Sequence, residues 1–178
     1  MVTGDYEAAQ RNLLAAKHTE PQSSAYADWC ELLAEIYERH SKQEDAIHEY
    51  KECVEREPRR AHNWARLAQL YERTGRFEEA IQSFREAVFA ALIGRYPLEM
   101  FFGAREQMPK TGLPTAAYSH RSGPVVDYLV ALDYLYAKLG RWEEHDEVHE
   151  YLLTLEVTSS ESESDDGTYA EDDDLERE

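Results

Sequence analysis

The chain repeats itself at an interval of 34 residues. Residues 27–60 align with residues 61–94 without a gap, and eleven of the 34 aligned positions carry the same amino acid. Seven of these identities are apolar or small: Ala27/Ala61, Leu33/Leu67, Ala34/Ala68, Tyr37/Tyr71, Ala46/Ala80, Ile47/Ile81 and Val54/Val88. Self-similarity at a fixed period of this size is typical of architectures in which neighbouring units stack on one another. The period therefore predicts a repeat array rather than a single closed core.

Each unit has the pattern of two helices joined by a turn. In the second unit one apolar stripe is spaced at i, i+3, i+4 and i+7, as expected for one face of a helix: Trp64, Leu67, Ala68 and Tyr71. A second stripe follows from Phe77 to Val88. Gly75 lies between them and can adopt the left-handed conformation that ends a helix at little cost. One hairpin cannot bury both of its faces, so neighbouring hairpins must stack.

These residues resemble the tetratricopeptide repeat family. The second unit matches the family pattern at Trp64, Leu67, Ala68, Tyr71, Gly75, Ala80, Phe84 and Ala87. The first unit matches at Leu33, Ala34, Tyr37, Ala46, Tyr50 and Pro58, with Cys30 and Ser41 in place of the tryptophan and the turn glycine. The resemblance implies an all-α fold, a right-handed α-solenoid of antiparallel helix pairs that acts as a non-enzymatic protein-interaction scaffold.

The remaining residues extend this array on both sides. We expect a repeat domain over residues 1–157, built from a half repeat (4–21), two repeats (27–60 and 61–94), a degenerate segment (95–123) and a last helix pair (124–156). The motif glycine–polar–aromatic–glutamate opens the second helix of a repeat at Gly4, Gly75 and Gly140. Residues 158–178 are acidic and almost free of apolar side chains, so we expect a disordered tail.

Composition narrows the classes of partner. The net charge of −18 is spread over both parts of the chain, −10 in residues 156–178 and −8 in residues 1–155. Such a field repels nucleic acid and anionic membranes, so we expect neither as a partner. A secretory signal and a spanning segment are absent from the sequence, which predicts a cytoplasmic protein with Cys30 and Cys53 as buried, reduced thiols. A disulfide between them is the alternative interpretation.

The resemblance also predicts a binding groove. In this family the non-core side chains of the first helices line a concave face, which here comprises Asp28, Glu31, Glu35, Glu38, His62, Arg66, Gln69 and Glu72. The acidic row on the first helix favours a basic or neutral peptide, although an ordinary solvated helix face has the same pattern. It disfavours the acidic chaperone C-termini that some family members bind through a carboxylate clamp, because Arg66 alone stands at a clamp position.

Two other groups of residues are candidates. The irregular segment 95–123 has a net charge of +2, and Arg105, Lys110, Tyr118 and Arg121 within it form a second candidate contact, the alternative being that its aromatic residues pack a degenerate repeat. His145 and His149 lie at i and i+4, a spacing that suits a metal ion, although the sequence shows no third ligand.

No pattern predicts catalysis or a cofactor. Three functions therefore stand at this point: a peptide-binding scaffold, which we favour; a metal-binding or metal-dependent protein that uses His145 and His149; and a structural repeat protein that self-associates through the open ends of its array.

Overall fold

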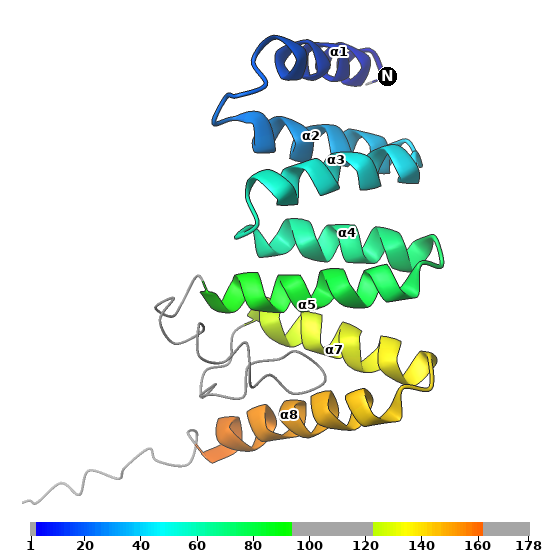
Figure 1. The fold of residues 1–178 in the computed structure, drawn as a ribbon, viewed down its shortest axis with the longest axis vertical. Helices are drawn as coiled ribbons and strands as arrows, with labels where there is room; N and C mark the ends of the chain where they lie inside the picture. The colour runs from blue at the N-terminus through cyan, green and yellow to red at the C-terminus, as the bar shows by residue number, and fades with distance from the viewer. Residues whose placement is uncertain (1–2, 94–122, 162–178) are drawn as a thin grey trace, which may run out of the picture.

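The structure is a computed structural model that describes residues 3–93 and 123–161, with side chains described over residues 6–92 and 124–153. Within these ranges the chain is helical apart from short turns. The seven described helices are α1 (Thr3–Thr19), α2 (Tyr26–Arg39), α3 (Gln43–Arg56), α4 (Ala61–Arg73), α5 (Phe77–Ile93), α7 (Gly123–Lys138) and α8 (Trp142–Glu161). They stack along one long axis, with α1 at one end and α8 at the other (Figure 1).

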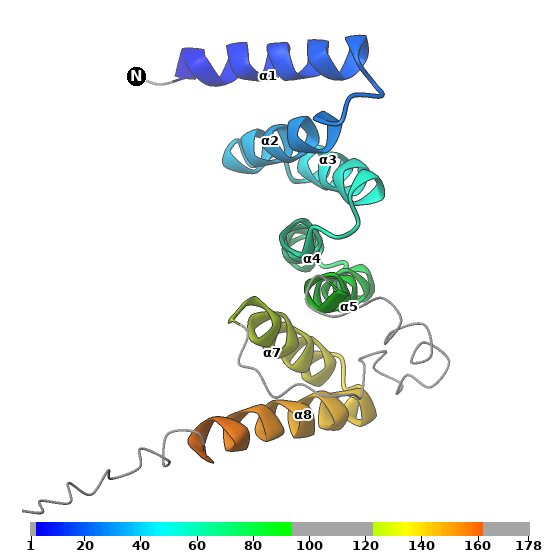
Figure 2. The ribbon, with the colours of Figure 1, turned by 90° about the vertical axis from the view of Figure 1, so that its left-hand side faces the viewer.

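The helices after α1 form antiparallel pairs. The pairs are α2 with α3, α4 with α5, and α7 with α8. Seen from the side, α2, α4 and α7 lie on one side of the stack, and α3 and α5 lie on the other (Figure 2). The prediction of an all-α solenoid of antiparallel helix pairs is confirmed.

The hairpins share one turn geometry. Gly75 has a φ of +77°, its N–H donates to Glu72 O at 3.0 Å, and the N–H of Arg76 donates to Tyr71 O at 2.8 Å. This pair of bonds is the Schellman motif, which satisfies the last carbonyls of a helix. Gly140 adopts the same conformation before α8. Ser41 adopts it between α2 and α3 with a φ of 57°, although a side chain is strained there.

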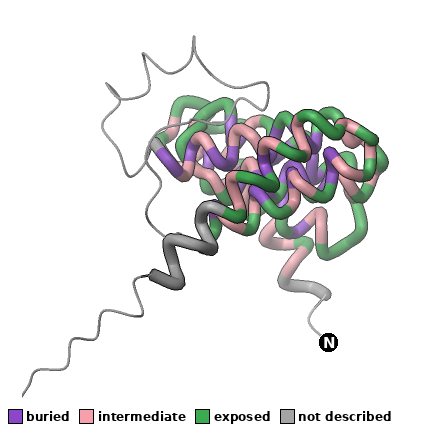
Figure 3. The backbone as a smooth tube through the Cα atoms, turned by 90° about the horizontal axis from the view of Figure 1, so that it is seen from below, coloured by how far each residue is buried: buried purple, intermediate pink, exposed green. Residues whose placement is uncertain are grey.

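The predicted apolar stripes form the core. A continuous cluster of buried side chains extends from α2 to α8, with the exposed residues outside it (Figure 3). Ala68 and Ala80 are fully buried where the two helices of one hairpin approach each other, and Tyr71 and Phe84 fill the space beside them. The buried side chains of α2 to α8 stabilise the stack, since each buried large apolar side chain contributes about 1.5–3 kcal/mol.

Helix α1 is attached differently from the rest. Its apolar residues Ala9, Leu13 and Ala16 are only partly buried. Lys17 holds the C-terminal end of α1 to the body, because its Nζ lies 2.5 Å from Glu49 Oε2 and 2.8 Å from Glu52 Oε2 on α3. The segment predicted as a half repeat, residues 4–21, contains this one helix, and a buried ion-pair network helps to hold it to the body.

Both thiols lie where α2 packs on α3. Cys30 and Cys53 are free and fully buried, as expected from their apolar surroundings. Burial raises the pKa of Cys30 to about 12 and that of Cys53 to about 11. Both side chains are therefore neutral and packed as small apolar groups.

The predicted boundaries at the C-terminal side differ slightly from the structure. Helix α8 continues to Glu161, four residues beyond the start of the predicted tail at residue 158. Helix ends are the least certain part of any sequence-based assignment, since a polar last turn needs no apolar partner to form. Residues 162–178, and the predicted degenerate segment up to residue 122, lie outside the described residues.

Candidate binding surfaces

The predicted groove residues lie on two neighbouring helices of one side of the stack. Helix α2 carries Asp28, Glu31, Glu35 and Glu38, and helix α4 carries His62, Arg66, Gln69 and Glu72 (Figure 2). Three of the eight, Glu31, Glu38 and Glu72, are partly buried, and the other five are exposed. The solenoid thus presents these side chains on one stretch of surface.

An arginine from the turn before α4 neutralises the first part of this acidic row. Arg60 lies 2.6 Å from Asp28 and 2.9 Å from Glu31. His62 Nε2 lies 2.9 Å from the second oxygen of Glu31. Burial alone would raise the pKa of Glu31, but hydrogen bonds from His62 and Asn63 outweigh it and hold this pKa below its usual value. At this end of the row the carboxylates are therefore already paired, and the His62–Glu31 contact joins the two repeats.

At the other end of the row, Arg73 forms an ion pair with Glu38 at 3.0 Å. The eight predicted residues contain five carboxylates and one guanidinium, a charge of −4, and including Arg60 and Arg73 reduces it to −2. Within the described part of the chain, Glu35 and Glu72 form no ion pair. The acidity that an incoming peptide meets is therefore concentrated at these two side chains.

A hollow between α1 and α2 adjoins the row. It has a volume of about 440 Å³. Its lining residues are Tyr6, Ala9, Asn12 and Leu13 of α1 with Leu32, Glu35, Ile36 and Arg39 of α2. Leu32 is 48% exposed, a large fraction for an aliphatic side chain. Arg39 Nη1 donates a hydrogen bond to Tyr6 Oη at 3.1 Å and so bounds one edge. Glu35 belongs both to this hollow and to the acidic row.

The hollow was not predicted from the sequence. The alignment of the two repeats pairs Leu32 with Arg66, so an apolar residue stands at a position predicted to contact ligand. That substitution was the available signal. The contribution of α1 carries no comparable signal, because it depends on how a lone helix settles against α2.

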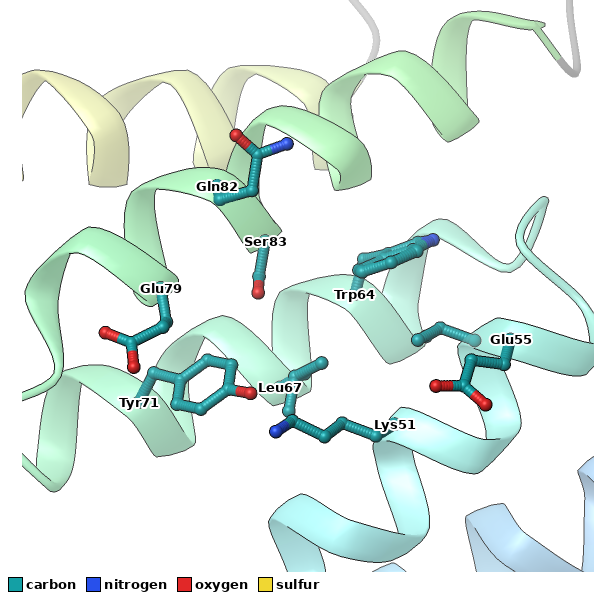
Figure 4. A pocket seen from close by; sticks show the side chains of 9 residues that line it. Lys51, Glu55, Trp64, Leu67, Tyr71, Glu79, Gln82 and Ser83 are labelled. Carbon is teal, nitrogen blue, oxygen red and sulfur yellow. The ribbon is translucent and has the colours of Figure 1, made fainter.

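A second pocket lies between α3, α4 and α5 (Figure 4). Its volume is about 320 Å³, and its walls combine apolar and polar side chains: Lys51, Val54, Glu55, Trp64, Leu67, Tyr71, Glu79, Gln82 and Ser83. The Trp64 ring is fixed by a hydrogen bond from its Nε1 to Pro58 O at 2.9 Å. Lys51 Nζ lies 5.6 Å from the centre of the Tyr71 ring. The predicted groove residues do not line this pocket.

The two candidate histidines lie on the last described helix. His145 is partly buried and His149 exposed, both on α8. Their side chains face Asp133 on α7, which the sequence did not single out. Arg105, Lys110, Tyr118 and Arg121, the second candidate contact, lie outside the described residues.

A stack of antiparallel hairpins with an exposed polar row defines a helical repeat protein, a class that offers extended surfaces to other proteins. The sequence profile of the tetratricopeptide repeat matches residues 61–88, the segment that spans α4 and most of α5. Residues 61–88 therefore match a tetratricopeptide repeat, and a repeat of this kind supports a protein-interaction scaffold.

Two solved structures are similar to this chain over most of its length. "MamA MSR-1 C2" is similar with a TM-score of 0.50 and 19% sequence identity, covering 90% of this chain and 71% of that chain. "Crystal structure of MamA" has a TM-score of 0.46 and 15% identity, covering 90% of this chain and 92% of that chain. At this identity the likeness concerns the fold alone. A comparison with curated protein sequences gave no match.

Among the described helices, not one combines the length and the apolar character needed to cross a bilayer.

Proposed function

We propose that the chain is a non-enzymatic scaffold that binds a basic or neutral amphipathic peptide segment of another protein across α2 and α4. The observation that supports this most directly is the position of Glu35, which lines the apolar hollow and also belongs to the acidic row. An apolar anchor and an unpaired carboxylate therefore adjoin on one surface. A peptide that carries an aliphatic residue next to a lysine or arginine complements both.

The hollow would supply most of the affinity. Leu32, Leu13 and Ile36 present aliphatic surface to it, and burying one leucine-sized side chain of a ligand is worth about 1.5–3 kcal/mol. The carboxylates would supply selectivity. An exposed ion pair is worth roughly 0.2–1 kcal/mol. Glu35 and Glu72 would therefore add little to the binding free energy of a peptide, and their main effect would be to favour basic over acidic peptides.

The same charges disfavour an acidic ligand. Glu31 and Glu35 stand where a bound carboxylate would need cations, and Arg60 is already occupied by Asp28 and Glu31. Only Arg66 is exposed and without an ion pair at this part of the described surface. Binding of acidic C-terminal peptides of chaperones is therefore not part of the proposal.

The proposal is tested with two fluorescent helical peptides that share an apolar face and carry either lysines or glutamates on the polar face. Fluorescence anisotropy should show saturable binding of the lysine peptide and weaker binding of the glutamate peptide. The double variant Glu35→Lys/Glu72→Lys should reverse this preference. Leu32→Asp should weaken both peptides at least tenfold by placing a charge in the apolar hollow.

Glu55→Lys is the matched control, because Glu55 is an exposed glutamate of the pocket between α3 and α5. It should leave both affinities unchanged. If Glu55→Lys reverses the preference and Glu35→Lys/Glu72→Lys does not, the binding surface is the pocket of Figure 4 and the proposed groove is wrong.

A further inference from the structure

Three possible metal ligands converge where α8 packs on α7. His145 Nε2 lies 3.4 Å from Asp133 Oδ1, and His149 Nδ1 lies 3.5 Å from the same oxygen. The three ligand atoms all lie within 4.8 Å of one another. Asp133 comes from α7, whereas both histidines come from successive turns of α8. The i, i+4 pair seen in the sequence therefore acquires a third ligand from the facing helix.

The spacing of these atoms fits a tetrahedral ion. With metal–ligand distances of about 2.0–2.1 Å, the edge of the coordination tetrahedron is about 3.3 Å. The two distances from Asp133 to the histidines, 3.4 and 3.5 Å, are close to that edge. The imidazole rings are stacked, with centroids 5.4 Å apart and planes inclined by 11°, so both rings face the carboxylate side by side.

The carboxylate oxygen itself accepts no hydrogen bond from the described residues. Asp133 Oδ1 is shielded from solvent and accepts no hydrogen bond within the described residues, since both imidazole nitrogens lie beyond hydrogen-bond reach of about 3.2 Å. A buried acceptor left in this state costs about 1–3 kcal/mol, more when it is charged. A cation placed between this oxygen and the two nitrogens would remove that cost.

His145 also has the outer partner that metal-bound histidines usually have. Its Nδ1 lies 3.1 Å from Asp146 Oδ1. A proton held on Nδ1 by this carboxylate leaves the Nε2 lone pair directed toward Asp133. Carboxylate–histidine pairs of this kind orient the ring and strengthen the ligand, and losing the outer partner typically costs 10–100-fold in metal affinity.

A second cluster in the protein has similar ligand groups, but a lysine already occupies the space between its carboxylates. Cys30, Glu49 and Glu52 also lie within reach of a single ion. The Lys17 ammonium already lies between the two carboxylates, and burial raises the pKa of the Cys30 thiol to about 12, which keeps it protonated. That cluster is satisfied by a lysine, whereas among the described residues no lysine or arginine pairs with Asp133.

We propose that Asp133, His145 and His149 bind a divalent metal ion such as zinc, which bridges α7 and α8. Two imidazoles and one carboxylate form a ligand set that zinc accepts, with water completing the tetrahedron. Helix α8 ends the described stack and packs on α7, so a metal link between these two helices would hold the end of the array. The site shares no residue with the proposed peptide groove, so the two proposals stand or fall separately.

The test is isothermal titration of the full chain, prepared without a histidine tag, with Zn²⁺. We expect one ion per chain. His145→Ala and His149→Ala should each weaken binding at least tenfold, and the double variant should abolish it. Asp146→Asn should weaken binding about tenfold through the outer partner. Zinc should raise the melting temperature of the parent chain and leave that of the double variant unchanged.

His48→Ala is the control, since His48 is an exposed histidine that pairs with a single glutamate, Glu52, at 3.4 Å. It should leave zinc binding unaltered. Circular dichroism of the double variant checks that the helices persist. Undiminished zinc affinity in a folded double variant, or the lack of any saturable binding to the parent chain, overturns the proposal.

Discussion

Arg60 Nη1, at the end of the first repeat, lies 2.9 Å from Glu31 Oε2 on the first helix of the same repeat. The residues are 29 positions apart in the chain, and the pair joins the turn before α4 to the outer surface of α2. Arg60 also contacts Asp28 and Glu57. One guanidinium therefore pairs with three carboxylates, and the last residue of the repeat offsets the like charges that would otherwise repel along α2.

Replacing Arg60 with Gln should lower the free energy of unfolding by about 1–2 kcal/mol, since an exposed pair is worth roughly 0.2–1 kcal/mol and this network contains three. Urea denaturation should show the loss, and it should shrink at high salt, which screens the charges. Arg66→Gln serves as control, because Arg66 has no ion pair among the described residues; it should cost less than about 0.5 kcal/mol. Equal losses for the two variants would contradict the network.

The same network predicts a pH dependence at Glu31. Its pKa is lowered in the folded chain, so the folded state holds this proton less tightly than the unfolded state does. The resulting stability is present above the unfolded value of about 4.3 and is lost as the pH falls through the lowered folded value. Glu31→Gln should therefore reduce the acid sensitivity of urea midpoints over this window. An unchanged pH profile would show that Glu31 contributes nothing.

Lys17→Met should release α1 from the stack. The change leaves Glu49, which is 5% exposed, without its counter-ion, and breaking a buried pair costs about 3–5 kcal/mol. Because α1 buries little apolar surface of its own, we expect it to detach rather than the whole chain to unfold. Amide hydrogen exchange in α1 should become at least about 100-fold faster, which corresponds to roughly 3 kcal/mol, while α4 and α5 stay protected.

Arg11→Met is the matched control for this helix, since Arg11 is exposed on α1. It should leave exchange unchanged. The double variant Lys17→Met/Glu49→Gln should recover part of the protection, because no unpaired charge is then buried. Equal exchange in α1 of the parent chain and Lys17→Met would mean that apolar contacts alone hold the helix.

Substitutions at the left-handed turn residues Ser41 and Gly75 should change the free energy of unfolding in opposite directions. Ser41→Gly relieves a left-handed side-chain conformation and should stabilise the chain by about 0.5–1 kcal/mol, after the entropy that glycine adds to the unfolded state. Gly75→Ala should destabilise it by about 1–2 kcal/mol. A Cβ at Gly75 would meet no atom within 4 Å, so the cost is one of backbone conformation. Thermal melting should move by roughly 2–4 °C per kcal/mol; shifts of the same sign would contradict the shared motif.

The features that could be predicted from the sequence are those that depend on contacts within one hairpin. Helices, turns and core positions such as Leu67 and Gly75 follow from spacing within one hairpin, and the 34-residue period places each hairpin beside the next. The Arg60 network could not be predicted, because it depends on where a turn residue lies against the preceding hairpin. Asp133 was missed for the same reason. Its proximity to His145 exists only once α8 is folded back on α7.

The buried thiols provide a last test of the packing between α2 and α3. Burial raises the pKa of Cys30 to about 12 and that of Cys53 to about 11, so at neutral pH neither forms the thiolate that reacts. A thiol-specific disulfide reagent should label both only as fast as the chain opens, and urea should restore the rate of a free thiol. Cys30→Ala and Cys53→Ala assign the two rates.

A pH dependence with a definite sign accompanies this burial. The folded chain binds the thiol protons more tightly than the unfolded chain, whose thiols ionise near 9. Stability is therefore full below about pH 9 and falls as the pH rises toward 11 and 12. The double variant Cys30→Ala/Cys53→Ala should lose this part of the alkaline decline in urea midpoints. Rapid labelling of the native chain at neutral pH would show instead that the α2–α3 interface opens without unfolding.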